Sequence, residues 1–227
     1  ELIPSITLLN RFINQHLGAA LLGNYFATPF MITSERTGIS LFYRELDLNK
    51  NLLVERLQTD WAAIAEETIS RYARPVKQEI QFVRDLLEVH QKPSPLSQEQ
   101  PGLVKLLKDM VGGEYVVQDN QLWFVFKRGA KTAIIPLHFA SAAAKSLLEL
   151  TFYLNGLAQP GDLLMIEEPE LNLHPTNQRK MARLLVRLIK AGIKVFITTH
   201  SDYLIKELNN LIILSNPFED REEIMTK

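Results

Sequence analysis

Two adjacent carboxylates, Glu167 and Glu168, directly follow the four apolar residues 163–166. A pair of acids can hold a hard cation such as Mg²⁺ and can orient and polarise a water molecule. Because desolvating two neighbouring acids is costly, such a pair at the end of a buried strand indicates a cation or a water beside it. The alternative is that both glutamates simply end a strand at a solvated edge, so the surrounding elements must decide between the two interpretations.

The apolar run before the acid pair is typical of a buried strand. It is too short for a helix, and Pro160-Gly161 and Pro169 bound it on either side. A run without polar alternation predicts a strand that is buried on both faces of a parallel sheet. In open α/β sheets ligands bind at the carboxyl ends of the strands, which is where the acid pair lies.

The sequence after the acid pair alternates between helical and strand patterns. In chain order we expect a helix over 176–190, a strand over 193–198, a short helix over 202–208 and a strand over 211–214. Such alternation predicts parallel strands joined by right-handed crossovers. His200 lies just after the strand expected over 193–198, so Glu168 and His200 are expected at the same edge of the sheet.

The order of these motifs resembles that of a known family. LLMIEEPELNLHP, residues 163–175, is followed by ITTHSDYL, residues 197–204. Together they resemble the Walker B, D-loop and switch-histidine series of ABC-type ATPase heads, and are most similar to the prokaryotic AAA-type, RecF/SMC-like and OLD-like ATPases. The resemblance implies an α/β fold of the P-loop NTPase class, an ABC-like lobe with a parallel sheet, a small antiparallel β meander and a helical insert.

The resemblance also implies roles for three residues in the hydrolysis of ATP with Mg²⁺. Glu167 would hold the Mg²⁺ directly or through water, and Glu168 would act as the general base that orients the attacking water. His200 would contact the γ-phosphate and report its loss. These residues are therefore the expected metal-binding residue, Glu167, and the expected catalytic residues, Glu168 and His200.

Three further residues are expected near the nucleotide at a dimer interface. Asn172 and His174 lie in the D-loop-like stretch of the resembled series. Ser141 is placed to cap a helix, and the free N–H groups of a capped helix start attract an anion. It stands where the family has its signature serine, which reaches the nucleotide of the partner head, although Ala143 replaces the usual glycine. As an isolated observation, Ser141 is a helix cap.

The chain contains no GxxxxGK[ST] phosphate-binding loop. The run Gly129-Ala130-Lys131-Thr132 lacks the first glycine and lies between two expected strands, so it is the wrong context for one. In the resembled family the loop lies upstream of every motif present here. We therefore expect a larger ATPase whose missing N-terminal P-loop lobe supplies the loop, and we expect this fragment to be inactive by itself.

The remaining patterns suggest three regions. A helix over 5–22 and a strand over 29–32 are expected first, then two helices meeting near Pro75, and later strands over 114–118, 121–126 and 132–136. The proposed boundaries are a remnant of the ATPase core over 1–46, a helical insert with a proline-rich linker over 47–102, and an ATPase lobe over 103–227. Arg36, in the polar turn Ser34–Gly38, is expected either to meet a phosphate or to be solvated.

Composition limits the partners. The 227 residues carry a formal net charge of −1 and no cysteine, so neither a strong pull toward nucleic acid nor a disulfide framework is expected. No run is long and apolar enough for a membrane span, and we expect a cytoplasmic protein with no membrane partner. The expected partners are a second copy of the head, through the ATP site, and possibly DNA or an effector protein. The alternative function is a degenerate, nucleotide-independent scaffold.

Overall fold

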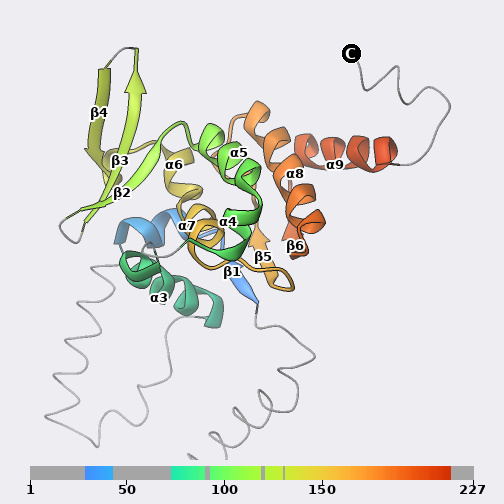
Figure 1. Cartoon of the computed structure of the whole chain (residues 1–227), viewed down its shortest axis with the longest axis horizontal. Coiled ribbons are helices and arrows are strands. Elements are labelled where there is room, and N and C mark those ends of the chain that lie inside the picture. The colour runs from blue at the N-terminus through green and yellow to red at the C-terminus, as the bar shows by residue number, and fades with distance from the viewer. Residues whose placement is uncertain (1–28, 43–72, 90–92, 119–120, 130, 216–227) are drawn as a thin grey trace, which may run out of the picture.

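The computed structural model of the protein describes residues 29–42, 73–89, 93–118, 121–129 and 131–215 (Figure 1). One parallel sheet has the strand order β1-β5-β6, and one antiparallel sheet has the order β2-β3-β4. The strands are β1 (Phe30–Ile32), β2 (Glu114–Gln118), β3 (Gln121–Arg128), β4 (Lys131–Pro136), β5 (Leu163–Glu167) and β6 (Lys194–Thr198). The helices are α3 (Arg74–Val89), α4 (Pro95–Glu99), α5 (Pro101–Val111), the 3-10 helix η1 (Leu137–Phe139), α6 (Ala142–Ser146), α7 (Leu148–Gly156), α8 (Pro175–Lys190) and α9 (Asp202–Ser215).

The parallel sheet confirms the strands expected over 29–32, 163–166 and 193–198. β5 lies between β1 and β6, with Leu164 opposite Phe30 on one side and opposite Val195 on the other. Leu164 and Ile166 are buried, whereas Met165 is only half-buried. The expectation of burial on both faces is therefore wrong for this part of the chain, because the buried positions of β5 all point to one face of the sheet.

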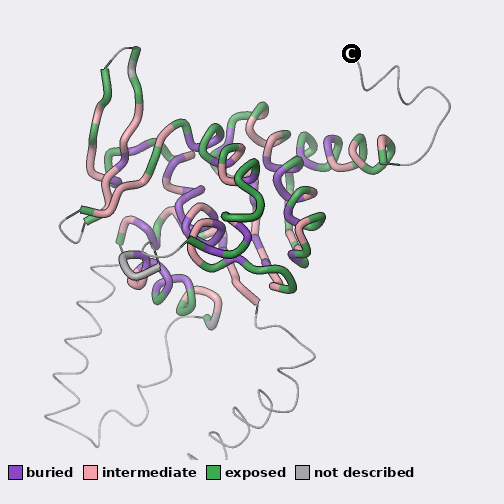
Figure 2. The backbone as a smooth tube through the Cα atoms, in the orientation of Figure 1, coloured by how far each residue is buried: buried purple, intermediate pink, exposed green. Residues whose placement is uncertain are grey.

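Helix α7 lies at the centre of the core (Figure 2). Leucines and aromatic residues are buried around its whole circumference, which is typical of a helix with other elements on every side. The ring of Tyr153 stacks on Phe30 of β1 with centroids 4.4 Å apart. Phe30 in turn meets Phe82 of α3 edge to face at 4.7 Å, so α3 and α7 pack against the same strand.

The connection from β5 to β6 is set by α8. Pro175 occupies the first turn, where a missing N–H costs nothing, and the leucines at 184, 185 and 188 form the buried face. Gly192 follows the helix with φ 89°, a left-handed conformation that favours glycine, and turns the chain into β6. The helix predicted over 176–190 is thereby confirmed.

Helix α9 corrects the prediction of a strand over 211–214. The helix continues through these residues to Ser215, beyond the end expected at Leu208. Its start is fixed by the Ser201 hydroxyl, which accepts a hydrogen bond from the Leu204 N–H at 3.1 Å. No proline or glycine interrupts the chain from there to Ser215, so the helix propagates and overrides the β propensity of Ile212 and Ile213. Both isoleucines are more than half exposed.

The β meander is confirmed, while the proline-rich linker contains more structure than expected. β3 pairs antiparallel with both β2 and β4, and the β3–β4 hairpin projects from the body of the molecule (Figure 1). Within 92–102, Ser94 caps α4 and its hydroxyl donates to the Leu154 carbonyl of α7 at 2.6 Å. Leu96 is buried, so α4 packs on the core; the domain boundaries themselves remain predictions.

Helix α3 confirms the second of the two helices expected around Pro75, which lies in its first turn. Ile80 and Val83 are buried, as the apolar spacing predicts. The first helix of that pair, the helix expected over 5–22 and the C-terminal residues 216–227 lie outside the described ranges. Among the helices of the described ranges, none is long and apolar enough to cross a bilayer.

Candidate functional site

The acid pair and the histidine share the carboxyl edge of the parallel sheet. Glu167, the last residue of β5, is in register with Thr198, the last residue of β6. The Glu168 N–H then donates to the Thr198 carbonyl at 2.8 Å, so the two chains stay joined one residue past the strands. His200 follows two residues later, and the expected placement of Glu168 and His200 at one edge is confirmed.

The Glu167 side chain is fixed by the turn after β1. Its Oε2 accepts hydrogen bonds from the backbone N–H of Ser34 at 3.1 Å and from the Ser34 hydroxyl at 3.3 Å. Glu167 is half-buried, so part of it stays accessible to solvent. A carboxylate held in this way presents its remaining oxygen in a defined direction.

Glu168 has an unusual backbone and an unengaged carboxylate. Its φ is 45°, in the left-handed region that costs a residue with a Cβ about 1 to 2 kcal/mol. Its carbonyl accepts from the Leu171 N–H at 2.9 Å and from Arg36 Nη2 at 2.6 Å. No group among the described residues donates a hydrogen bond to the half-buried carboxylate, which leaves it available for a ligand.

Arg36 is neither in contact with solvent nor placed to reach a phosphate, which corrects the expectation from sequence. It begins the helical segment 36–42 and is only 2% exposed. Four of its five N–H groups donate to backbone carbonyls. Nη1 donates to Thr33 and Glu167, both at 2.8 Å, Nη2 donates to Glu168, and Nε donates to Ser146 of α6 at 3.0 Å.

Glu170 was not singled out from the sequence, although it is the third acid of the Glu-Glu-Pro-Glu run. Its Oε1 accepts from the Thr199 hydroxyl at 2.7 Å and from the His200 N–H at 2.8 Å. The imidazole of His200 itself is exposed. Glu170 thus holds the segment that carries His200, and its position after the strand-ending pair is the signal that could have identified it.

The other three predicted site residues lie at exposed positions around this edge. Asn172 has φ 61°, and its Nδ2 donates to the Thr37 hydroxyl at 3.3 Å. The His174 Nδ1 accepts from the Thr176 N–H at 3.3 Å and caps α8. Ser141 caps α6 through the Ala144 N–H at 3.1 Å, as expected. Within the described ranges, no hydrogen bond joins Ser141 to the acid pair, so a role for Ser141 at this chain's own edge has no support.

A second pair of acids, Glu79 of α3 and Glu149 of α7, lies buried behind Arg36. Each is 1% exposed. Burial raises the pKa of Glu149 well above its usual range, and the charge of Glu79 raises it further. Burial also raises the pKa of Glu79, although hydrogen bonds from the N–H and hydroxyl of Thr33 favour its charged form.

Burial favours a neutral member in this pair, since it raises the pKa of both carboxyl groups. Glu79 Oε1 and both Glu149 oxygens have no hydrogen-bond donor among the described residues. Because Glu79 has the two donors of Thr33, we assign the proton to Glu149. Burial lowers the pKa of Arg36, while Glu149 and Glu79 act in the opposite direction, and one carboxylate then balances its charge.

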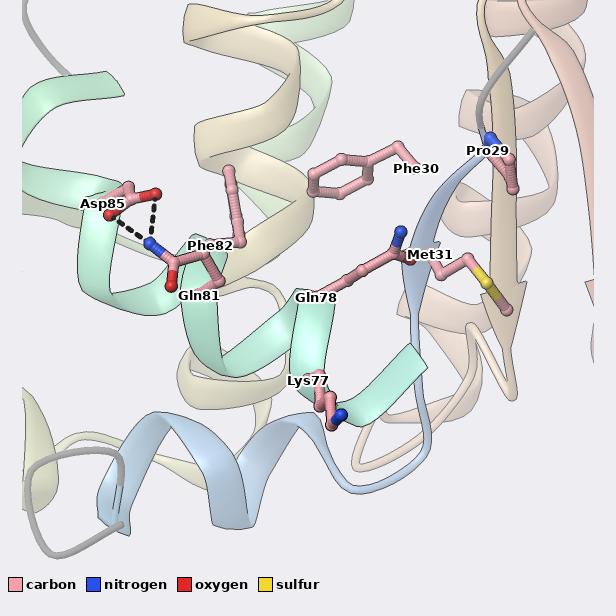
Figure 3. A pocket seen from close by; sticks show the side chains of 8 residues that line it. All are labelled: Pro29, Phe30, Met31, Lys77, Gln78, Gln81, Phe82 and Asp85. Carbon is pink, nitrogen blue, oxygen red and sulfur yellow. Dashed lines mark hydrogen bonds between the residues drawn. The ribbon is translucent and has the colours of Figure 1, made fainter. Parts of the chain in front are cut away.

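A cavity of about 420 Å³ opens between β1 and α3, away from the acid pair (Figure 3). Phe30, Met31 and Phe82 form its apolar lining, and Gln81 at its wall donates to Asp85 at 2.9 Å. The cavity lies at the start of β1, whereas Ser34 and Glu167 lie beyond its end. It is therefore separate from the edge site.

The edge can hold Mg²⁺ only together with a ligand. In the part of the chain that is described, no three His, Cys, Asp or Glu side chains cluster as a metal site would require. Mg²⁺ is commonly bound by one or two carboxylates, waters and substrate phosphates instead of a protein cage. Glu167 fits that pattern because Ser34 fixes one of its oxygens, and no group in the described ranges donates a hydrogen bond to the other.

The AAA ATPase domain family matches residues 33–205, which is more than half of the chain, and the chain therefore belongs to this family. The family confirms the α/β fold of the P-loop NTPase class. The match begins at Thr33 and ends at Ile205, so it includes Arg36, the acid pair and His200.

No curated protein matches the chain. One similar solved structure is the Smc head domain with an extended coiled coil, bound to the C-terminal domain of ScpA, from Pyrococcus furiosus. The two are 14% identical, and the alignment covers 78% of this chain and 56% of that one, with a TM-score of 0.34. The chain thus spans little more than half the length of that structure, and at this TM-score the likeness carries no argument about function.

Proposed function

We propose that this chain forms the part of an ATPase head in which Glu167 and Glu168 act on Mg²⁺-ATP. The observation that carries the proposal is the state of the acid pair. One carboxylate is held by Ser34, and the other has a fixed backbone and no hydrogen-bond partner among the described residues. A strand that merely ended at a solvated edge would need neither the strained φ of Glu168 nor its three backbone hydrogen bonds.

Glu168 is the general base of the proposed reaction. A carboxylate with no protein donor can accept a hydrogen bond from a water molecule and orient it for in-line attack on a phosphorus atom. In phosphoryl transfer this positioning and the electrostatic stabilisation of the transition state account for most of the catalysis. The backbone contacts of Glu168 serve this role because they fix where the side chain begins.

Glu167 would hold the Mg²⁺ directly or through water. When bound, the ion neutralises the charge that develops on the phosphate oxygens. The Ser34 hydrogen bonds to Oε2 leave Oε1 for this contact. His200 would meet the γ-phosphate, since its ring is exposed at the same edge and its backbone is held by Glu170.

Two heads complete the proposed site. Asn172, His174 and Ser141 are exposed and lie on turns or helix starts, as residues that reach across a dimer interface must. The phosphate-binding loop would come from a segment outside these 227 residues, since the sequence contains none. We place such a head in DNA maintenance or anti-phage defence in the cytoplasm, on the resemblance of its motifs to RecF/SMC-like and OLD-like ATPases.

The second candidate is a nucleotide-independent scaffold. The absence of the phosphate-binding loop from the sequence favours it, and so does Ala143, whose methyl group stands where the family has glycine. A scaffold would keep the fold but would have no use for a free carboxylate at Glu168. The two candidates therefore differ in the effect of neutralising that residue.

The test measures Mg²⁺-dependent ATP hydrolysis by the full-length protein beside Glu168→Gln, with sedimentation of both in ATP. We expect turnover in the wild type, its loss in the variant and accumulation of an ATP-bound dimer. The matched control is Glu114→Gln, which neutralises an exposed glutamate of β2 paired with Lys108 and should keep wild-type turnover. No turnover and no change in mass with ATP, from folded protein, would leave the scaffold.

A further inference from the structure

Arg36 joins three segments that are far apart in the sequence. Its guanidinium contacts the carbonyl of Thr33 after β1, those of Glu167 and Glu168 at the end of β5, and that of Ser146 at the last residue of α6. Ser146 is itself tied to the segment after the acid pair, because its hydroxyl donates to the Leu171 carbonyl at 2.9 Å. The end of α6 and the turn of the acid pair are thus connected twice, once through Arg36 and once through the Ser146 hydroxyl.

These contacts fix the conformation of Glu168. The Glu168 N–H is held by Thr198, and its carbonyl is held by Arg36 and by the Leu171 N–H. A left-handed φ in a residue other than glycine or asparagine persists only where the surroundings enforce it. Arg36 supplies the shortest of the three bonds, at 2.6 Å, and it is a charge-assisted one.

The cost of burying Arg36 indicates that its position matters. A buried guanidinium must be paired or fully hydrogen-bonded, and here it donates to four carbonyls while the carboxyl groups of Glu149 and Glu79 favour its charge through space. Glu79 in turn is held by Thr33, whose carbonyl accepts from Arg36. The arginine and its counter-ion therefore meet at the same residue after β1.

We propose that Arg36 is a positioning residue that sets the direction of the Glu168 carboxylate and links it to the end of α6. This inference rests on the proposed role of Glu168 in ATP hydrolysis. Arg36 does not touch the reacting atoms, since all four of its hydrogen bonds go to backbone carbonyls. Lysine cannot replace it, because an ammonium group is a single point and cannot span carbonyls from three segments as the planar fork does.

The kinetic test compares Arg36→Lys with Arg183→Lys in the full-length protein. Arg183 is a matched control because it is exposed on α8 and, among the described residues, its side chain bonds to Glu207 alone. We expect kcat of Arg36→Lys to fall by about a hundredfold with KM within about threefold, the size of effect that a displaced catalytic group produces. Arg183→Lys should keep both constants. Equal kcat for wild type and folded Arg36→Lys would overturn the inference.

A second measurement does not depend on nucleotide. Hydrogen exchange of the Glu168 and Leu171 amides reports the turn directly, since both are bonded in the folded protein. We expect both to be protected in the wild type and to exchange roughly tenfold faster in Arg36→Lys, with the Leu184 and Leu185 amides of α8 unchanged. Free exchange of both amides in the wild type, or equal protection in the variant, would overturn the inference.

The two readouts separate this inference from the proposed function. Suppose that the wild type hydrolyses no ATP but that Arg36→Lys speeds hydrogen exchange at the Glu168 and Leu171 amides alone. The proposed ATPase function is then wrong, and the positioning role of Arg36 stands. If Arg36→Lys does not fold, the charge-balanced double variant Arg36→Gln with Glu79→Gln replaces it, because it removes the arginine and its counter-ion together. The same local exchange and loss of kcat are expected, and wild-type values in that variant would contradict the inference.

Discussion

The molecule contains two pairs of glutamates with opposite surroundings. Glu167 and Glu168 are adjacent in sequence, half-buried and open at the end of a strand. Glu79 and Glu149 come from two helices, are each 1% exposed and face a buried arginine. Among the described residues the edge pair has one carboxylate without a donor, whereas burial raises the pKa of both acids of the buried pair and favours a neutral member there.

The comparison shows how one chemical group serves two purposes. Where solvent and a ligand can reach, two acids can remain next to each other and bind a cation or a water. Where they cannot, one acid must be neutral, and the other must balance a cation. Arg36 connects the two pairs, because it donates to the backbone of the edge pair and takes its counter-charge from the buried pair.

The largest predicted effect is on stability when the buried carboxylate is removed. Glu79→Gln removes one of the two buried carboxyl groups that favour the charge of Arg36, and breaking a buried charge pair in this way costs about 3 to 5 kcal/mol. Glu167→Gln, the matched change at the edge, should alter the free energy of unfolding by less than about 1 kcal/mol. Urea denaturation of both variants measures the difference, and equal losses would remove the distinction between the pairs.

The pH dependence of stability tests where the proton of the buried pair lies. The pKa of Glu149 is raised in the folded state above its ordinary value of 4.5. Above pH 4.5 the folded state therefore keeps a proton that the unfolded state has released. The stability from this group is fully present below that pH and is lost as pH rises through the folded-state pKa, by at most about 1.4 kcal/mol per pH unit.

Glu149→Gln mimics the protonated acid and should lack this decline. The variant should therefore gain stability relative to wild type as the pH rises from 4.5 toward 8. Urea unfolding at several pH values measures that difference between the two proteins, so that groups common to both cancel. A difference that stays constant with pH would place the proton elsewhere.

Sequence reasoning identified one pair and missed the other for a physical reason. Glu167 and Glu168 are neighbours that end an apolar run, so local pattern alone predicts their strand, their edge and the closeness of His200. Glu79 and Glu149 are seventy positions apart and look like ordinary polar residues of two helices. Only the packing of α3 and α7 on β1 brings them together.

Arg36 and α9 show the same limit. An arginine in Ser34–Gly38 reads as solvated or phosphate-binding, and its burial is decided by β5 and α6, more than a hundred residues away. The run 211–214 has the β propensity of a strand, but α9 starts at a capped residue and meets no helix breaker. In both cases tertiary context or helix propagation overrides a correct local preference.

Replacing Glu168 by glycine tests stability and activity at the edge separately. Glu168→Gly relieves the left-handed φ of 45°, and after the entropic cost of glycine we expect a net gain of about 1 kcal/mol. The control is Asn172→Gly at φ 61°, which should change stability by less than about 0.5 kcal/mol because asparagine tolerates this conformation. Urea denaturation checks the stability of both variants.

If the proposed function is right, Glu168→Gly hydrolyses no ATP although it is more stable than the wild type. A loss of stability in Glu168→Gly would show that the carboxylate itself supports the fold.

The smallest predicted effect concerns the donors that keep Glu79 charged. Thr33→Val preserves the shape of the side chain and the Thr33 N–H bond to Glu79 but removes the hydroxyl bond. One hydrogen bond to a charged acceptor contributes about 1.5 to 3 kcal/mol, and because the Thr33 N–H bond remains we expect a smaller loss, of about 1 kcal/mol. Thr151→Val is the control, since its hydroxyl donates to the carbonyl of Leu147, the residue that precedes α7. If Thr33→Val is no less stable than Thr151→Val, the Thr33 hydroxyl does not determine that Glu79 is the charged acid of the buried pair.

The proton would then be as stable on Glu79 as on Glu149. The buried pair would be symmetric, and the description of one neutral acid and one carboxylate would be wrong.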